Sequence, residues 1–273
     1  MTEAPTRTTL VERAQTLLDA HHGPRPLVLP NIWDVASAQV VTEAGFPVIA
    51  TSSRAIAASL GLKDDDSSDP DVIFEVVARI ARAVDCPVTA DLEAGYDLEP
   101  KELVERILRA GIVGCNLEDS DHHGDDVLVD ARRQAAFLAE VRGAADDFGV
   151  HIVINARVDS FIRHVGDERY ELEDAIHRGQ LYLEAGADCI YPIALVDRDR
   201  IARIVTALRG PVNITARRGG LSLDELTTLG VKRISFASGI FQLSNDHLHM
   251  IVQRLSETSD PGALWQELPA GSG

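Results

Sequence analysis

The stretch RAGIVGCNLE, residues 109–118, decides the fold, because a helical segment ends at Gly111 and an apolar run of strand character follows at once. Glycine adopts the left-handed conformation that ends a helix at little steric cost. Three further stretches repeat this order, namely EAGFPVIA (43–50), EAGADCIYP (184–192) and TLGVKRISF (228–236). The repetition predicts a chain built from successive helix and strand units.

Working outward from this stretch, eight short apolar runs of strand character follow one another along the chain. They are LVLP (27–30), PVIAT (47–51), PVTAD (87–91), IVGCNLE (112–118), HIVINAR (151–157), DCIYP (188–192), PVNIT (211–215) and VKRISF (231–236). Segments with the apolar spacing of helices separate them, and another follows the last run at 238–255. Eight such units predict an α/β fold of the (β/α)8 type, a TIM barrel, preceded by a helix at residues 7–20. A doubly wound open sheet is the alternative, since periodicity alone does not distinguish closure from a sheet with edges.

The length of 273 residues suits one barrel domain, and no low-complexity linker divides the chain. We therefore expect a single domain over residues 1–273, with disordered tails at 1–6 and 269–273. The formal net charge of -17 leaves no broad basic face for nucleic acid. The three cysteines form no CxxC pair, and neither a signal sequence nor a membrane-spanning apolar run occurs. We expect a cytoplasmic protein without nucleic-acid or membrane partners.

Polar residues gather where the predicted strands end, which is where barrel enzymes place their active sites. They are Asn31, Thr51, Ser52, Ser53, Arg54, Asp91, Glu93, Glu118, Asp119, Asn155, Arg157, Asn213, Ser235 and Ser238. Asp91, Glu93 and Glu118 offer the hard oxygen ligands that Mg²⁺ prefers, so they predict a Mg²⁺ site. The alternative is that Glu93 and Glu118 pair with arginines and bind no metal.

Arg157 ends the fifth predicted strand, and its planar guanidinium matches a carboxylate or a developing enolate. A structural ion pair with Asp159 or Glu118 is the alternative, which the sequence leaves open. His122 and His123 are either proton donors or members of a solvated loop. Lysines occur at 63, 101 and 232 only; Lys101 begins a predicted helix, Lys232 begins a predicted strand at the opposite rim, and the cysteines lie in or beside strands. Nucleophilic catalysis by lysine or cysteine is therefore disfavoured.

Five segments resemble, in order, the signature segments of the isocitrate lyase/phosphoenolpyruvate mutase superfamily. They are TSSRAIAASLGLKDD (51–65), TADLEAGYD (89–97), GCNLEDS (114–120), INARVDSF (154–161) and EAGADCIYP (184–192). The resemblance covers residues 27 to about 240. It implies a (β/α)8 barrel that forms a homotetramer, a dimer of dimers, with C-terminal helices exchanged between subunits.

The resemblance also implies a Mg²⁺ ion, for which Mn²⁺ could substitute, chelated by a small organic acid with a 2-oxo group. Asp64, Asp91, Glu93 and Glu118 match the acidic positions around the metal, with Asp91 as the expected direct ligand. Ser52, Glu118 and Arg157 are the expected catalytic residues. The expected substrate-binding residues are Ser52, Ser53, Arg54, His122, His123, Arg157 and Asn213.

Two departures from the superfamily pattern narrow the reaction. The chain reads SDHHGDD (120–126) where isocitrate and methylisocitrate lyases carry a KKCGH-like loop with a catalytic cysteine, so those activities are not expected. Ser120 and Gly124 occupy the positions of two lysines that the phosphonate enzymes keep. We expect a Mg²⁺-dependent lyase that breaks a carbon–carbon bond of a 2-oxo or 2-hydroxy dicarboxylic acid through a pyruvate enolate. The alternatives are a carbon–phosphorus mutase or hydrolase acting on phosphonopyruvate, and a barrel that binds 2-oxo acids without catalysis.

Overall fold

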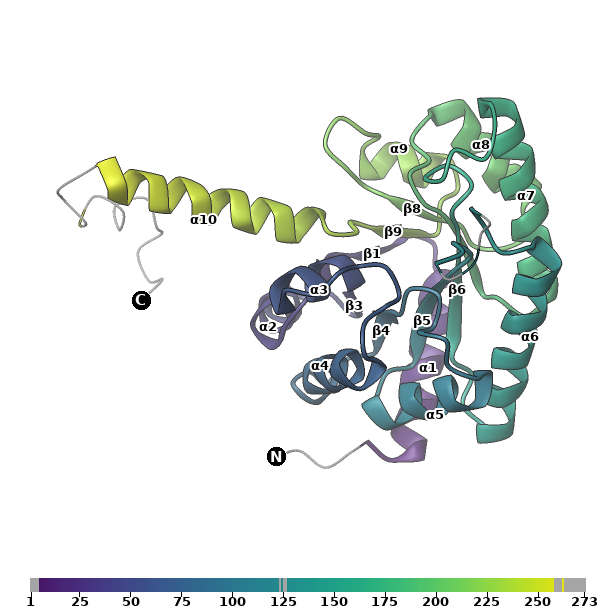
Figure 1. Cartoon of the computed structure of the whole chain (residues 1–273), viewed down its shortest axis with the longest axis horizontal. Coiled ribbons are helices and arrows are strands. Elements are labelled where there is room, and N and C mark those ends of the chain that lie inside the picture. The colour runs from purple at the N-terminus through teal and green to yellow at the C-terminus, as the bar shows by residue number, and fades with distance from the viewer. Residues whose placement is uncertain (1–4, 123, 125–126, 258–261, 263–273) are drawn as a thin grey trace.

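The computed structural model describes residues 5–122, 124, 127–257 and 262 and shows parallel strands that alternate with helices (Figure 1). The strands are β1 (Leu27–Leu29), β2 (Asn31–Ile32), β3 (Ile49–Thr51), β4 (Val88–Asp91), β5 (Gly114–Glu118), β6 (Val153–Val158), β7 (Cys189–Pro192), β8 (Asn213–Thr215) and β9 (Arg233–Ser235). The helices are α1 (Arg7–His21), α2 (Val35–Glu43), α3 (Ser53–Leu60), α4 (Pro70–Arg82), α5 (Pro100–Ala110), α6 (Ala131–Phe148), α7 (Glu168–Glu184), α8 (Arg198–Ala207), α9 (Leu223–Thr228) and α10 (Gly239–Glu257). Each of the eight predicted strand runs contains an observed strand.

The strands close into a barrel, which confirms the predicted fold and excludes the open sheet. β2 to β7 form one parallel ladder in chain order, and β1, β9 and β8 form a second. The ladders join on one side through the bridge between Ile190 and Val212. On the other side they join through the first strand run, which Pro30 splits into β1, paired with β9, and β2, paired with β3. Proline has no N–H to donate to a ladder, which accounts for the split.

The predicted helix ends have the expected geometry. Gly111 follows α5 with a φ of 83°, and its N–H donates to carbonyls in the last turn. The glycines at 45, 186 and 230 also have positive φ. Each therefore lets the chain turn directly from a helix into the next strand.

Helix α1 closes the N-terminal end of the barrel. Its Leu10, Ala14 and Leu17 pack in one cluster with the valines that precede or begin the strands. A Cβ placed on Gly114, the first residue of β5, would lie 2.7 Å from Leu17 Cδ2. Thr6 caps α1, while residues 1–4 and 269–273 of the expected tails lie outside the described residues. The opposite end of the barrel, where the strands finish, stays open for a site.

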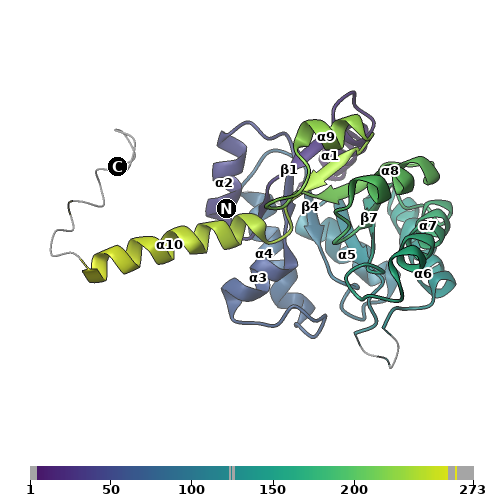
Figure 2. The same cartoon turned by 90° about the horizontal axis from the view of Figure 1, so that it is seen from above.

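Helix α10 leaves the barrel instead of covering it (Figures 1 and 2). Trp33 and Phe241 meet edge to face at its base, with ring centroids 5.0 Å apart. None of the α10 residues is buried, and its exposed apolar side chains are Leu243, Leu248, Met250, Val252 and Leu255. Along the described segments, no helix has the length and apolar character needed to cross a bilayer.

Candidate active site

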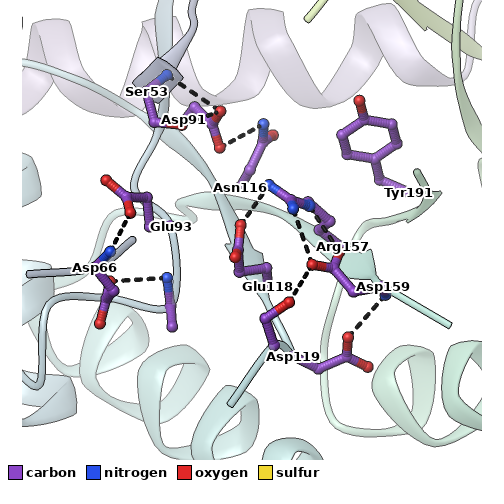
Figure 3. A network of polar contacts seen from close by, with 12 residues as sticks. Ser53, Asp66, Asp91, Glu93, Asn116, Glu118, Asp119, Arg157, Asp159 and Tyr191 are labelled. Atoms are coloured by element: carbon purple, nitrogen blue, oxygen red, sulfur yellow. Dashed lines mark hydrogen bonds and ion pairs between the residues drawn. The ribbon is translucent and has the colours of Figure 1, made fainter. Parts of the chain in front are cut away.

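Arg157 lies near the end of β6, within a network of acidic side chains (Figure 3). Its Nε and Nη2 donate to the two carboxylate oxygens of Asp159 at 2.7 and 2.8 Å, and its Nη1 pairs with Glu118. Burial lowers the pKa of Arg157, but Glu118, Asp159 and Asp91 outweigh it, so the net pKa is raised. Both ion pairs that the sequence offered as alternatives are present. The two ion pairs hold the guanidinium in a fixed position. A fixed position is also required of an arginine that binds substrate.

A second layer of contacts supports Asp159, which is fully buried. Its backbone N–H donates to Asp119 at 2.8 Å, and the hydroxyl of Ser120 donates to its carboxylate. Asp119 in turn accepts from Tyr182 at 2.7 Å and from Arg178 at 3.2 Å. Burial and the nearby Asp159 raise the pKa of Asp119 to about 7. The position of Arg157 is therefore tied to helix α7 through Asp119.

Asp91 ends β4 and has donors on both carboxylate oxygens (Figure 3). Oδ2 accepts from the amide and the hydroxyl of Ser53 at 3.2 and 2.8 Å. Oδ1 accepts from Asn116 Nδ2 at 3.2 Å. The carboxylate of the expected metal ligand is thus fixed by the first residue of α3 and by a residue in the middle of β5.

Glu93 lies in the loop after β4 and is held without an arginine. Its carboxylate accepts from the backbone N–H of Asp66 and from the hydroxyl of Tyr96, the latter at 3.2 Å. Asp66 has a φ of 58° and accepts from the N–H groups of Ala94 and Tyr96, so the two loops brace each other. Burial, together with Asp64, Asp91 and Glu118, raises the pKa of Glu93 to about 8. The arginine pairing considered for Glu93 is absent among the described residues, whereas that of Glu118 is present.

Glu118 joins Arg157 to His122. Its Oε1 lies 2.7 Å from His122 Nε2, and this hydrogen bond raises the pKa of His122. Burial raises the pKa of Glu118 despite Arg157, and burial together with Asp91 raises that of Asp64. His123 lies outside the described residues.

A cavity of about 220 Å³ opens at these residues. It is lined by Arg54, Asp64, Glu93, Glu118, His122, Arg157, Asp159, Ile162 and Arg163. A larger cavity of about 570 Å³ lies alongside and shares Glu118 and His122 with it. The smaller cavity has the size of a small organic acid with its waters.

Two predicted site residues have other placements. Ser52 is buried as the cap of α3, and its hydroxyl accepts from the N–H of Ala55 at 3.3 Å. Asn213 is the first residue of β8, fully buried, and accepts from Ser235 at 3.1 Å. It does not line the cavity, because the strand ends two residues later, at Thr215.

Tyr191, at the end of the sixth predicted strand, was not among the predicted site residues. Tyr191 pairs in register with Arg157 and lies beside it in Figure 3. Its hydroxyl lies 2.6 Å from Thr215 Oγ1. Burial raises the pKa of Tyr191, so its phenol stays neutral and places an aromatic ring beside the arginine. Its place at the end of the sixth predicted strand, where a barrel positions site residues, was the signal that could have found it.

The donor set fits Mg²⁺ with few direct protein ligands. Within the described ranges, no group of three His, Cys, Asp or Glu side chains converges as a ready metal cage. Mg²⁺ usually keeps several waters and binds through one or two carboxylates plus substrate oxygens, which this arrangement allows. Burial is the main cause of the raised pKa values of Asp64, Glu93 and Glu118, and the neighbouring carboxylates add to it. A divalent cation bound beside these carboxylates would favour their charged forms.

Lysine and cysteine chemistry finds no support at the site. Lys232 Nζ donates to the carbonyl of Gly23 at the opposite end of the barrel. Burial raises the pKa of Cys115 and of Cys189 to about 12, so both remain thiols. Both cysteines are fully buried, as expected for thiols that lie in or beside strands.

A parallel barrel with acidic residues and a fixed arginine where its strands end belongs to the α/β-barrel class in which active sites lie at that end. The family model described as phosphoenolpyruvate phosphomutase matches residues 17–255. An uncharacterized protein of Mycobacterium tuberculosis (strain ATCC 25618 / H37Rv) is 31% identical over 221 residues, which is 81% of each chain. The chain therefore belongs to the phosphoenolpyruvate phosphomutase family, within the PEP mutase/isocitrate lyase superfamily of lyases and mutases.

Solved structures agree. A Burkholderia cenocepacia J2315 protein described as a candidate phosphonomutase has a TM-score of 0.83 at 36% identity, covering 89% of this chain and 99% of its own. Phosphonopyruvate hydrolase in complex with oxalate and Mg²⁺ has a TM-score of 0.83 at 22% identity, covering 95% and 92%. A 2,3-dimethylmalate lyase follows at 0.81 and 23% identity, covering 96% and 91%. At these last two identities the likeness shows the fold alone.

Proposed function

We propose that this chain is a Mg²⁺-dependent lyase that breaks a carbon–carbon bond of a small 2-oxo or 2-hydroxy dicarboxylic acid. The observation that carries the proposal is the fixed guanidinium of Arg157 beside the acidic cavity, held by Asp159 at 2.7 and 2.8 Å and by Glu118. A preorganised cation at that place stabilises an oxygen whose negative charge grows as a bond breaks. Breaking a carbon–carbon bond next to a carbonyl produces such an oxygen.

Oxaloacetate illustrates what the residues would do. The bond between C3 and C4 breaks, C4 leaves as carbon dioxide, and the electron pair stays on C3 and delocalises to the C2 oxygen as an enolate. Arg157 stabilises that oxygen, and His122, held by Glu118, is placed to hold the proton that C3 then takes up. Mg²⁺, held through Asp91 with Asp64, Glu93 and Glu118 around it, would supply Lewis-acid polarisation of the substrate oxygens.

Binding of a dianionic acid requires further cations, because the chain carries a net charge of -17. Arg54 and Arg163 line the same cavity as Arg157. Arg163 donates to Ser120 at 2.8 Å, whereas the side chain of Arg54 is exposed at the start of α3. We assign Arg54 to the substrate carboxylate remote from the bond that breaks.

A carbon–phosphorus reaction on phosphonopyruvate is the second candidate. The candidate phosphonomutase at 36% identity favours it. Ser120 argues against it, since this residue stands where a phosphonate enzyme keeps a lysine and its hydroxyl is bound to Asp159.

The decisive experiment measures Mg²⁺-dependent pyruvate release from oxaloacetate, 2-methylmalate-type acids and phosphonopyruvate. Wild type, Arg157→Ala and Arg169→Ala are compared, the last being an exposed arginine on α7 that pairs only with Glu173 in the described chain. Release from a carbon acid that is lost in Arg157→Ala and kept in Arg169→Ala supports the lyase. Conversion of phosphonopyruvate alone, to pyruvate by hydrolysis or to phosphoenolpyruvate by isomerisation, refutes it in favour of the second candidate. Oxalate binding with no turnover of any of the acids indicates a binding barrel.

We further propose that the chain forms a homotetramer in which α10 packs on a neighbouring subunit. The support is that α10 buries none of its own residues and exposes five large apolar side chains. Sedimentation of wild type and of Leu248→Asp tests this. A monomeric wild type refutes it, and a Leu248→Asp variant that dissociates supports it.

A further inference from the structure

Arg233 is a charged side chain that lies buried inside the barrel and not at the solvent-exposed surface. It is the first residue of β9 and is 1% exposed. Its partners in the described part of the chain are the amide oxygen of Asn116, 3.2 Å from Nη2, and the imidazole of His21, 3.5 Å from Nη1. Neither partner carries a negative charge to offset the guanidinium. Burying an unpaired cation costs free energy, so the presence of Arg233 inside the barrel indicates a role beyond packing.

His21 leaves the charge of Arg233 uncompensated. Its Nδ1 lies 2.8 Å from the carbonyl of Leu17, so Nδ1 carries the proton and Nε2 faces Arg233 as an acceptor. Burial and Arg233 lower the pKa of His21 to about 4. The imidazole is therefore neutral near pH 7, and α1 presents an acceptor to Arg233 and no counter-charge.

Asn116 connects Arg233 to the site. Its Oδ1 accepts from Arg233 and from Asn155 Nδ2, the latter at 2.7 Å. Its Nδ2 then points to Asp91 Oδ1 at 3.2 Å. The opposite orientation of the amide would place its NH₂ against two donors and its oxygen against a carboxylate. Arg233 therefore fixes which end of Asn116 meets Asp91.

We propose that Arg233 is a positioning residue, which acts through Asn116 to hold the Asp91 carboxylate in the orientation that binds the divalent cation. The inference rests on the proposed Mg²⁺ site. It adds to that site the guanidinium of Arg233, which is linked to Asp91 through Asn116. Residues that orient a metal ligand typically change metal affinity 10- to 100-fold when removed. The chain of contacts crosses the barrel from β9 through β5 to β4.

The test is calorimetric titration of the full chain with MgCl₂ alone, in wild type, Arg233→Met and Arg142→Met. Arg142 is the matched control, since it is also largely buried but bonds to Asp188 at 2.7 Å and to the carbonyl of Ile152 at 2.9 Å, at the closed end of the barrel. We expect Arg233→Met to weaken Mg²⁺ binding about tenfold or more and Arg142→Met to leave it unchanged, although both lower the unfolding midpoint in EDTA.

Asn116→Leu provides a second route that keeps Arg233 in place. It should weaken Mg²⁺ binding as Arg233→Met does, and the double variant should lose no more than either single one, because the two residues act in series. Additive losses, or unchanged Mg²⁺ affinity in Arg233→Met, would overturn the inference while leaving the Mg²⁺ site intact. If Arg233→Met does not fold, unchanged affinity in Asn116→Leu overturns it. A wild type that binds no Mg²⁺ refutes the metal part of the proposed function and this inference with it.

Discussion

Asp159→Asn should destabilise the protein and reduce turnover, because it breaks the fork that holds Arg157. The carboxylate accepts from Arg157 at 2.7 and 2.8 Å and also from Ser120, and it is fully buried. The amide keeps the volume but turns an NH₂ toward one of these donors. Each hydrogen bond to a charged group contributes about 1.5–3 kcal/mol. Loss of the charge also relieves repulsion from Asp119, whose pKa Asp159 helps to raise.

The net loss in the free energy of unfolding should therefore be about 3 kcal/mol, the lower end for breaking a buried ion pair. Urea unfolding followed by circular dichroism measures it, and turnover should fall about 100-fold because Arg157 is no longer held in place. Glu173→Gln is the control, since it breaks an exposed pair with Arg169 and should change stability by about 0.5 kcal/mol or less. An Asp159→Asn variant with wild-type stability and turnover would refute the reasoning.

Three other predictions concern acidity, packing and thiols. The pKa of Glu93, raised to about 8, means that the folded chain keeps a proton that the unfolded chain releases above pH 4.5, so stability in EDTA should fall as pH rises from 4.5 to 8. Glu93→Gln should flatten that fall, and parallel curves for the two proteins would contradict the assignment. Gly114→Ala should cost about 1–3 kcal/mol because its Cβ meets α1 at 2.7 Å, whereas Gly143→Ala on α6, with open space around it, should stabilise by about 0.4–1 kcal/mol; equal unfolding midpoints would show that α1 does not seal the barrel. Cys115 and Cys189 should react with Ellman's reagent only after urea is added, and rapid reaction of either in the native state would contradict their burial.

The barrel was predictable from the sequence because its signals are local. The apolar runs, the helical spacing and the glycines that follow four of the helices all act within a dozen residues. The split of the first strand was not predicted, although Pro30 was visible in it. Whether that proline ends the strand or transfers it between two partners depends on where β9 and β3 lie.

The site was predictable only in part. The acidic strand ends and Arg157 follow from the rule that barrel sites lie at the C-terminal ends of strands. Asp66 was missed because it lies in the run DDDSSD (64–69), where only the left-handed φ of 58° turns this aspartate toward the Glu93 loop. Asn116 and Arg233 were missed because their meeting inside the barrel depends on the register of β5 and β9, which periodicity does not give.

The pairing of β1 with β9 sets a condition on how this chain folds. Leu27 and Arg233 lie in register although they are about 200 residues apart in the sequence. A chain emerging from the ribosome thus carries an unpaired strand edge at β1 until nearly all of it has been made, and such an edge invites association with other chains. Ring closure of such length is expected to be slow and late. Truncation before residue 233 should then yield aggregation, because the segment from residue 233 onward supplies the strand that covers the edge of β1.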